Sequence, residues 1–208
     1  MVLFCHGNAG NISYLIDTVQ QYARVGLSAF IFDYRGYGQS EGKPSEKGTY
    51  RDAEAAWHYL VETKQIASSD IIIIGRSLGG AIAAWLATKH TPMAVILEAS
   101  FTTLPDIGSQ LYPYLPVKFL TNFAYNTIDY ISHVHCPVLV VHSQDDQMIP
   151  IDHGRKLYAA AHEPKDFLEI SGGHNEGFFA SEEPYLQGLD AFIERRLESK
   201  VYEGTVFR

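Results

Sequence analysis

The sequence predicts an α/β fold in which helices flank a mostly parallel sheet. Short apolar runs rich in Val, Ile and Phe alternate with longer segments of helical period, as in sheets joined by crossover helices. The short runs are apolar throughout, which fits strands that are covered on both faces. The length of 208 residues suits one such unit, and we expect residues 1–208 to form a single domain.

Six apolar runs are the predicted strands. Each is four to six residues long, a length typical of strands rather than helices. In chain order they are Val2–Cys5, Leu27–Phe32, Ile71–Ile74, Ala94–Leu97, Val138–Val141 and Phe167–Ile170.

Five further segments have apolar residues at helical spacing. Asn11 and Asp152 stand where helix N-caps are expected. The apolar face of the first segment comprises Ile12, Leu15, Ile16, Val19 and Ala23, and the other four segments centre on residues 50–61, 79–89, 157–161 and 186–193.

The segment Phe101–Tyr130 interrupts this alternation. It is rich in Phe, Tyr, Leu and Pro and has weak periodicity. We expect a short cap-like insertion at about residues 101–130. It either walls an apolar pocket or packs over the sheet as core.

Composition excludes several classes of partner. The formal net charge is −8, and an acidic chain is poorly suited to bind the phosphates of nucleic acid. No apolar stretch is long enough to span a bilayer, and Met1–Cys5 has the character of a strand rather than of a signal peptide. A cytoplasmic location is therefore expected. Cys5 and Cys136, the only cysteines, lie in apolar surroundings and predict two buried, reduced thiols.

The most informative motif is Gly75-Arg76-Ser77-Leu78-Gly79. It follows a predicted buried strand and opens a predicted helix, which is the context that a nucleophile elbow requires. A serine on such a sharp turn presents its hydroxyl above the sheet. Side chains at Gly75 and Gly79 would collide with the turn, so glycine is needed at both positions. Ser77 is therefore the predicted nucleophile.

A serine nucleophile needs a base, and the base needs an acid to orient it. His174 lies in the Gly-rich loop after the last predicted strand, and it is the predicted base. The adjacent Asp145 and Asp146 follow the preceding strand, and both are candidates for the acid in the chain order Ser, Asp, His. The strand-end Glu98 is a further alternative.

The same chemistry needs backbone N–H groups that bind a developing oxyanion. One is expected from Leu78, directly after the nucleophile, and a second from the loop after the first strand. Asn8 is the predicted donor in that loop, with Ala9 as its neighbouring alternative.

No cofactor and no metal ion are predicted. His133-Val134-His135-Cys136 could suggest a metal site, but it lacks the further ligands of a plausible zinc site. The sequence contains neither a His-Glu-x-x-His motif nor a phosphate-binding P-loop.

These motifs together resemble the α/β-hydrolase fold. The chain is similar to small, nearly capless α/β-hydrolase-domain proteins, a group that includes eukaryotic depalmitoylases and bacterial esterase-like relatives. The resemblance runs from about Val2 to about Arg195. It rests on residues 6–11 (HGNAGN), 33–40 (DYRGYGQS) and 75–80 (GRSLGG), on Asp146 with Ile149-Pro150, and on Gly173-His174-Asn175.

Two features depart from that family's pattern. Ser143 occupies a position where the family usually has Gly, which puts the turn that presents the acid in question. The chain also opens at what resembles the family's third strand, so that Leu27–Phe32 becomes an edge strand. A long hydrophobic edge is prone to association, and we expect a second copy of the chain or a further N-terminal segment to cover it.

The resemblance implies a serine hydrolase that cleaves carboxylic esters or thioesters, with Asp146 as the acid that orients His174. Because the insertion at about residues 101–130 is too short for a large lid, we expect short to medium acyl chains. A peptidase or amidase would use the same residues, and a non-catalytic binding member of the fold is a further alternative.

Overall fold

The computed structural model describes residues 1–111, 114 and 123–206. Within these residues, six strands form one sheet in the order β2-β1-β3-β4-β5-β6, and every neighbouring pair is parallel. The predicted α/β architecture is therefore confirmed. The strands are β1 (Val2–Cys5), β2 (Ala29–Ile31), β3 (Ile72–Arg76), β4 (Ala94–Glu98), β5 (Val138–Ser143) and β6 (Lys165–Ile170).

The strand bounds differ from the predicted ones at several ends. β3, β4 and β5 each run on into a polar residue, namely Arg76, Glu98 and Ser143, because backbone pairing continues there: Arg76 pairs with Glu98 and Ser143 with Ile170. β2 is shorter than the predicted Leu27–Phe32. It pairs only with β1 and is an edge of the described sheet.

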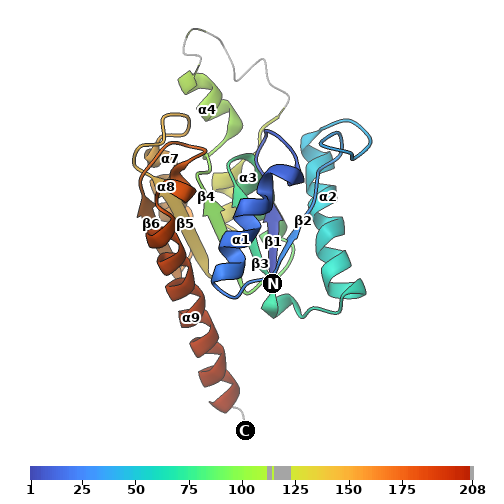
Figure 1. The fold of residues 1–208 in the computed structure, drawn as a ribbon, viewed down its shortest axis with the longest axis vertical. Coiled ribbons are helices and arrows are strands. Elements are labelled where there is room, and N and C mark those ends of the chain that lie inside the picture. The colour runs from blue at the N-terminus through green and yellow to red at the C-terminus, as the bar shows by residue number, and fades with distance from the viewer. Residues whose placement is uncertain (112–113, 115–122, 207–208) are drawn as a thin grey trace.

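Helices cover both faces of the sheet (Figure 1). One face packs against α2 (Glu46–His58), α3 (Leu78–Ala87), α6 (Thr127–Ile131) and α7 (Ile151–Ala160). The other packs against α1 (Ile16–Arg24), α8 (Gly177–Ala180) and α9 (Glu182–Val206). The remaining described helices are α4 (Leu104–Leu111), the 3-10 turns Ile12–Leu15 and Ser68–Asp70, and a π-helical turn at Tyr59–Thr63.

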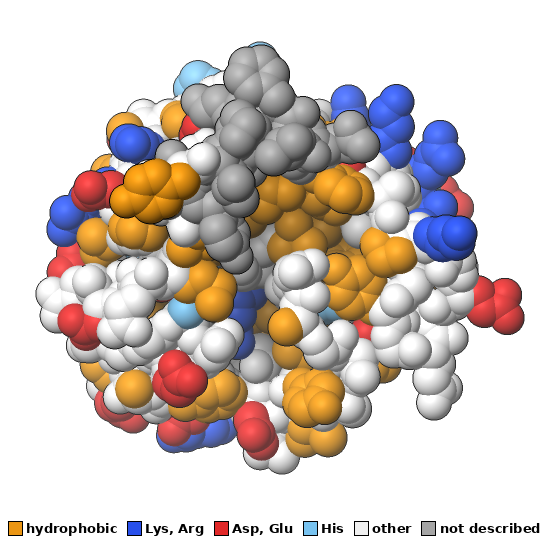
Figure 2. Space-filling model, turned by 90° about the horizontal axis from the view of Figure 1, so that it is seen from above, with side chains coloured by type: hydrophobic (Ala, Val, Ile, Leu, Met, Phe, Trp, Pro, Cys, Tyr) orange, Lys and Arg blue, Asp and Glu red, His pale blue; other side chains and the backbone are white. Residues whose placement is uncertain are grey.

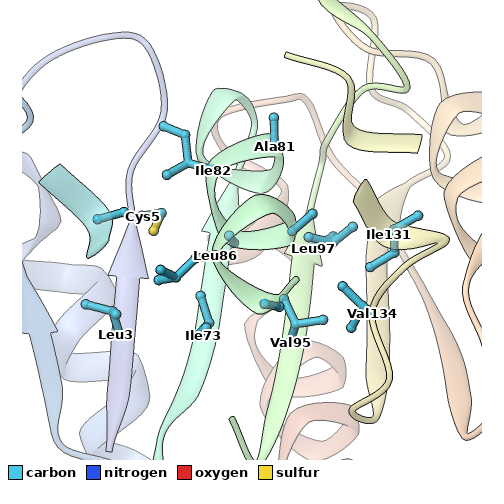
Figure 3. Packing of buried hydrophobic residues seen from close by; sticks show 14 of the residues in the cluster. Leu3, Cys5, Ile73, Ala81, Ile82, Leu86, Val95, Leu97, Ile131 and Val134 are labelled. Atoms are coloured by element: carbon cyan, nitrogen blue, oxygen red, sulfur yellow. The ribbon is translucent and has the colours of Figure 1, made fainter. Parts of the chain in front are cut away.

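The core follows from the pleat of the strands. Successive residues point to opposite faces, so Leu3 and Cys5 face α3 while Val2 and Phe4 face the layer of α1 and α9. Figure 3 shows the first of these layers, where apolar side chains of the sheet meet those of α3 and of the segment around Ile131. Cys5 and Cys136 are buried and unpaired, as expected.

Two helix predictions were wrong in detail. Asp152 is not an N-cap: α7 is capped at Pro150, and Asp152 lies in its first turn. In α1 the buried residues are Thr18, Gln21 and Tyr22, whereas Ile16 is 60% exposed. Asn11 is an N-cap as predicted, since its side chain accepts a hydrogen bond from the N–H of Ser13.

Among the described residues, no helix is both long enough and apolar enough to cross a membrane. The predicted insertion at residues 101–130 contributes α4 and part of α6, and its central portion lies outside the described residues.

Candidate active site

The candidate site lies where the chain changes direction across the sheet. From β1 the chain passes to β2 on one side, and then crosses to β3 on the other. The loops after β1 and β3 therefore diverge at the carboxyl edge, which is where ligand sites of open parallel sheets form. Ser77 follows β3 at this point, and the loop that begins at His6 follows β1.

Ser77 has a backbone conformation that residues with side chains rarely adopt, with φ 54° and ψ −117°. Its two flanking glycines make this turn possible. A Cβ on Gly75 would lie 2.6 Å from the Cβ of Ala83, and a Cβ on Gly79 would lie 2.6 Å from the carbonyl carbon of Cys5. The turn is therefore packed so closely that side chains are excluded, as the motif predicts.

Backbone and side-chain hydrogen bonds hold the turn in place. The N–H of Ser77 donates to the carbonyl of Glu98 at 2.8 Å, and the Ser100 hydroxyl donates to the carbonyl of Ser77 at 2.9 Å. The nucleophile candidate is thus fixed to the end of the neighbouring strand β4.

The structure brings the three predicted catalytic residues together from distant parts of the chain. Nε2 of His174 lies 3.2 Å from the Oγ of Ser77, and Nδ1 of His174 lies 2.7 Å from Oδ2 of Asp146. Because Nδ1 faces a carboxylate, it carries the hydrogen, and Nε2 is left with a lone pair toward the serine hydroxyl. This is the arrangement that a general base requires.

Asp146 is held as a carboxylate. Its Oδ1 accepts hydrogen bonds from the N–H groups of Met148 at 2.9 Å and Ile149 at 2.8 Å. Burial alone would raise the pKa of Asp146. The hydrogen bonds from His174 and Ile149, with the charges of His174 and His142, outweigh burial and lower that pKa.

The alternative acids have other partners. Oδ2 of Asp145 accepts a hydrogen bond from the N–H of Gly172 at 3.0 Å. The Glu98 carboxylate is fully buried. It pairs with Arg76 at 2.8 Å, and its other oxygen accepts hydrogen bonds from Tyr22 and Tyr185. Of the three candidates, Asp146 is the one that the structure places against His174.

Ser143 does not disrupt the turn that presents the acid. Its hydroxyl donates to the carbonyl of Gly172 and accepts from the N–H of Asp145 at 3.1 Å. Together with the Asp145 carboxylate, it binds both backbone groups of Gly172. The loop that carries Asp146 is thereby fixed to the loop that carries His174.

Several supporting residues were missed by the sequence analysis. The Tyr37 hydroxyl donates to the side-chain oxygen of Asn8 at 2.7 Å, and the Tyr34 hydroxyl donates to the carbonyl of His6 at 3.0 Å. Nε2 of His142 lies 3.7 Å from Oδ2 of Asp146 and 2.8 Å from the carbonyl oxygen of Ile149. Tyr34 and Tyr37 belong to the motif at residues 33–40, so the motif was noticed but its role in holding the loop after β1 was not.

The two predicted oxyanion donors, Asn8 and Leu78, border the same cavity as Ser77. A Cβ placed on Gly7 would lie 3.5 Å from the Cβ of Ser77, so the loop after β1 passes directly beside the serine. Leu78 opens α3, where backbone N–H groups are free of helical partners. The position of both residues suits the predicted role, which remains a prediction.

The cavity beside Ser77 has a volume of about 550 Å³. Most of its wall is apolar, and no Asp, Glu, Lys or Arg is found among its described lining residues. Figure 2 looks onto this side of the molecule, where hydrophobic side chains gather around a hollow beside the residues drawn in grey. The predicted insertion contributes Phe101, Leu104, Ile107, Leu111, Phe123 and Tyr125 to the wall.

Comparisons with known proteins identify the family and the fold. Residues 1–128 match the family model described as the alpha/beta hydrolase fold. An uncharacterized protein of Mycobacterium tuberculosis is 40% identical over 193 residues, which are 92% of this chain and 69% of that protein. The alpha/beta hydrolase domain-containing protein WAV2 of Arabidopsis thaliana is 36% identical over 225 residues, covering 98% of this chain and 73% of WAV2.

Among solved structures, an esterase of Pyrococcus furiosus superposes with a TM-score of 0.78 at 17% identity, covering 93% of this chain and 80% of the esterase. At that identity the likeness concerns the fold. The family model and the curated relatives go further, because they match the chain at the level of sequence. The chain belongs to the α/β-hydrolase fold family.

Proposed function

We propose that this chain is a serine hydrolase that cleaves carboxylic esters or thioesters through an acyl-enzyme intermediate. The observation that carries the proposal is the hydrogen-bonded series from Ser77 through His174 to Asp146 at the wall of an apolar cavity. A serine hydroxyl is a weak nucleophile at neutral pH, and a base within hydrogen-bond reach is what activates it.

In the first half of the reaction, Oγ of Ser77 attacks the carbonyl carbon and His174 takes the hydroxyl proton at Nε2. The N–H groups of Leu78 and Asn8 bind the resulting oxyanion, and loss of one such donor typically costs about a hundred- to a thousand-fold in kcat. The tetrahedral intermediate then expels the alcohol or thiol, which leaves with the proton from His174. Asp146 holds the imidazole tautomer and stabilises the imidazolium.

In the second half, water attacks the acyl-enzyme while His174 takes its proton. The bond between the acyl carbon and Ser77 breaks, and His174 returns the proton to the serine. The products are a carboxylic acid and the free enzyme, so the cycle requires no cofactor and no metal ion.

The composition of the cavity favours an uncharged acyl group of short to medium length as the part of the substrate that binds there. Its described wall is largely aliphatic and aromatic, and burial of such a chain is favoured by the hydrophobic effect. The substrate on this proposal is a small acyl ester or thioester, with no nucleic-acid partner. The predicted cytoplasmic location remains part of the proposal.

A fluorophosphonate probe tests the proposal, because it reacts with activated serines. We expect labelling of the wild type and of a Ser132→Ala control, and none of Ser77→Ala or His174→Ala. Hydrolysis of p-nitrophenyl acetate, compared with an aminoacyl anilide, then separates an esterase from a peptidase or amidase. An unlabelled, folded wild type would favour a non-catalytic binding role instead.

A further inference from the structure

A second group of polar side chains lies at the end of the molecule opposite Ser77. α3 begins beside Ser77 and runs for 10 residues, about 15 Å, before the chain reaches His90. At this opposite end, His90 meets Glu54 and His58 from the last turns of α2. One ligand atom from each of the three side chains lies within 4.8 Å of the other two.

The ring nitrogen Nε2 of His90 makes no hydrogen bond to the described residues. It is buried, and the nearest carboxylate oxygen, Oε1 of Glu54, is 4.0 Å away. The ring of Trp57 stacks on the imidazole with centroids 4.7 Å apart, which fixes its orientation. Burying a polar atom without a hydrogen-bond partner costs free energy. A ligand bound to Nε2 of His90 would remove that cost.

His58 is oriented by a carboxylate on its far side. Its Nδ1 lies 2.8 Å from Oε1 of Glu62, one helical turn further along the chain. With Nδ1 donating to that carboxylate, Nε2 is the nitrogen that keeps a lone pair. Histidines that bind metal ions characteristically donate their other ring hydrogen to a carboxylate in this way.

We propose that Glu54, His58 and His90 form a binding site for a divalent transition-metal ion such as Zn²⁺. Two imidazole nitrogens and one carboxylate oxygen are a ligand set that suits Zn²⁺, with water as the fourth ligand. Tetrahedral ligands lie roughly 3.4 Å apart, so the side chains must approach one another slightly. Glu54 and His58 are partly exposed and can make this adjustment.

The sequence-based expectation of no metal ion considered His133–Cys136 and the lack of a His-Glu-x-x-His motif, but not Glu54, His58 and His90. The segment His133–Cys136 is not brought into such a group: Nδ1 of His133 lies 2.8 Å from the carbonyl of Asp129, and His135 stacks on His162. The proposed ion would instead fasten the end of α2 to the segment after α3. Its role is structural, because the site is far from the serine.

Titration of metal-stripped protein with Zn²⁺, followed by calorimetry, tests the proposal. We expect one Zn²⁺ per chain and a higher melting temperature with the ion bound. His58→Gln should weaken binding at least tenfold, and Glu62→Gln should weaken it by about ten- to a hundred-fold through the orientation of His58. His90→Gln should abolish binding. Because His90→Gln also loses the stacking on Trp57 and could unfold, His58→Gln is the variant that decides the test.

Two variants distinguish this site from other histidines. His133→Gln and His174→Gln should both bind Zn²⁺ as the wild type does. Substitution with Co²⁺ gives a separate readout, since tetrahedral coordination produces strong visible absorption. A wild type that binds no ion, unaltered binding in His58→Gln, or loss of binding in His174→Gln would each overturn the proposal.

Discussion

Asp145 and Asp146 are adjacent in the sequence but have different partners. Asp146 accepts a hydrogen bond from the imidazole of His174, whereas Asp145 accepts one from the backbone N–H of Gly172. Both contacts lie at the junction of the two loops that follow β5 and β6. One carboxylate therefore orients the base, while the other fixes the loop on which the base stands.

The two acids predict different kinetic effects. In Asp146→Asn the amide no longer stabilises the imidazolium and favours the wrong tautomer, so kcat should fall by about 10⁴-fold. Asp145→Asn keeps an oxygen that can accept from Gly172, and it should cause a much smaller loss. Rates of p-nitrophenyl acetate hydrolysis measure both. Equal losses in the two variants would contradict the assignment of Asp146 as the orienting acid.

At the scale of elements, β2 forms one edge of the described sheet. β2 has only β1 as a partner, and its residues Ala29, Phe30 and Ile31 are each only partly buried. Unpaired backbone groups along an edge strand can bond to another chain. We propose that this edge is covered, either by a second copy or by further N-terminal chain.

Charge at this edge tests the proposal. The chain of residues 1–208 should self-associate in light-scattering measurements at micromolar concentration. Ser28→Lys places a cation on the exposed residue before β2 and should reduce that association, as edge lysines do in natural sheets. Gln187→Lys, on the exposed side of α9, is the matched control and should leave it unchanged. A wild type that is monomeric throughout would count against the proposal.

Elements also differ in how well their pattern could be interpreted from sequence. The strands were predicted because their apolar runs are local and continuous. The buried face of α1 was not, because its interior residues are polar and find partners far along the chain. Gln21 donates to the carbonyl of Phe178 at 3.0 Å, and Tyr22 lies against Glu98. Periodicity of apolar residues cannot reveal a face whose burial depends on such distant partners.

The candidate site shows a similar division. Ser77, His174 and Asp146 were chosen because each follows a strand, and parallel strands bring their carboxyl ends to one edge. The family resemblance favoured Asp146 over Asp145, whereas position after the strand left both open, because it does not say which side of the turn faces His174. The roles of Tyr37 and Ser143 depend on contacts between loops that no local pattern encodes.

At the scale of the whole molecule, buried histidines couple the fold to pH. Burial is the main cause that lowers the pKa of His6, His142 and His153. Their unfolded forms titrate near their usual pKa, about 6.5, and so bind protons at a pH where the folded forms do not. As pH falls from the unfolded pKa of about 6.5 toward the lowered pKa values of the folded protein, protonation favours unfolding and the free energy of unfolding decreases.

Urea denaturation at pH 8 and pH 5.5 measures this dependence. The midpoint should be lower at pH 5.5, and His142→Gln should lessen the difference because one buried titrating group is gone. His133→Gln serves as the control for replacing a histidine elsewhere. A midpoint that is equal or higher at pH 5.5 would mean that the buried imidazoles do not govern acid stability.

Glu98 connects the turn at Ser77 to the helix layer of α1, α8 and α9. The carbonyl of Glu98 accepts a hydrogen bond from the N–H of Ser77. The carboxylate of Glu98 accepts hydrogen bonds from Tyr22 of α1 and Tyr185 of α9. It also pairs with Arg76, whose guanidinium lies 4.1 Å from the ring centre of Phe178 in α8. We expect a change in α9 that displaces Tyr185 to disturb Glu98 and, through the Glu98 carbonyl, the turn that holds Ser77. On the proposed function, the reaction rate would then respond to substitutions in a buried layer outside the described lining of the cavity.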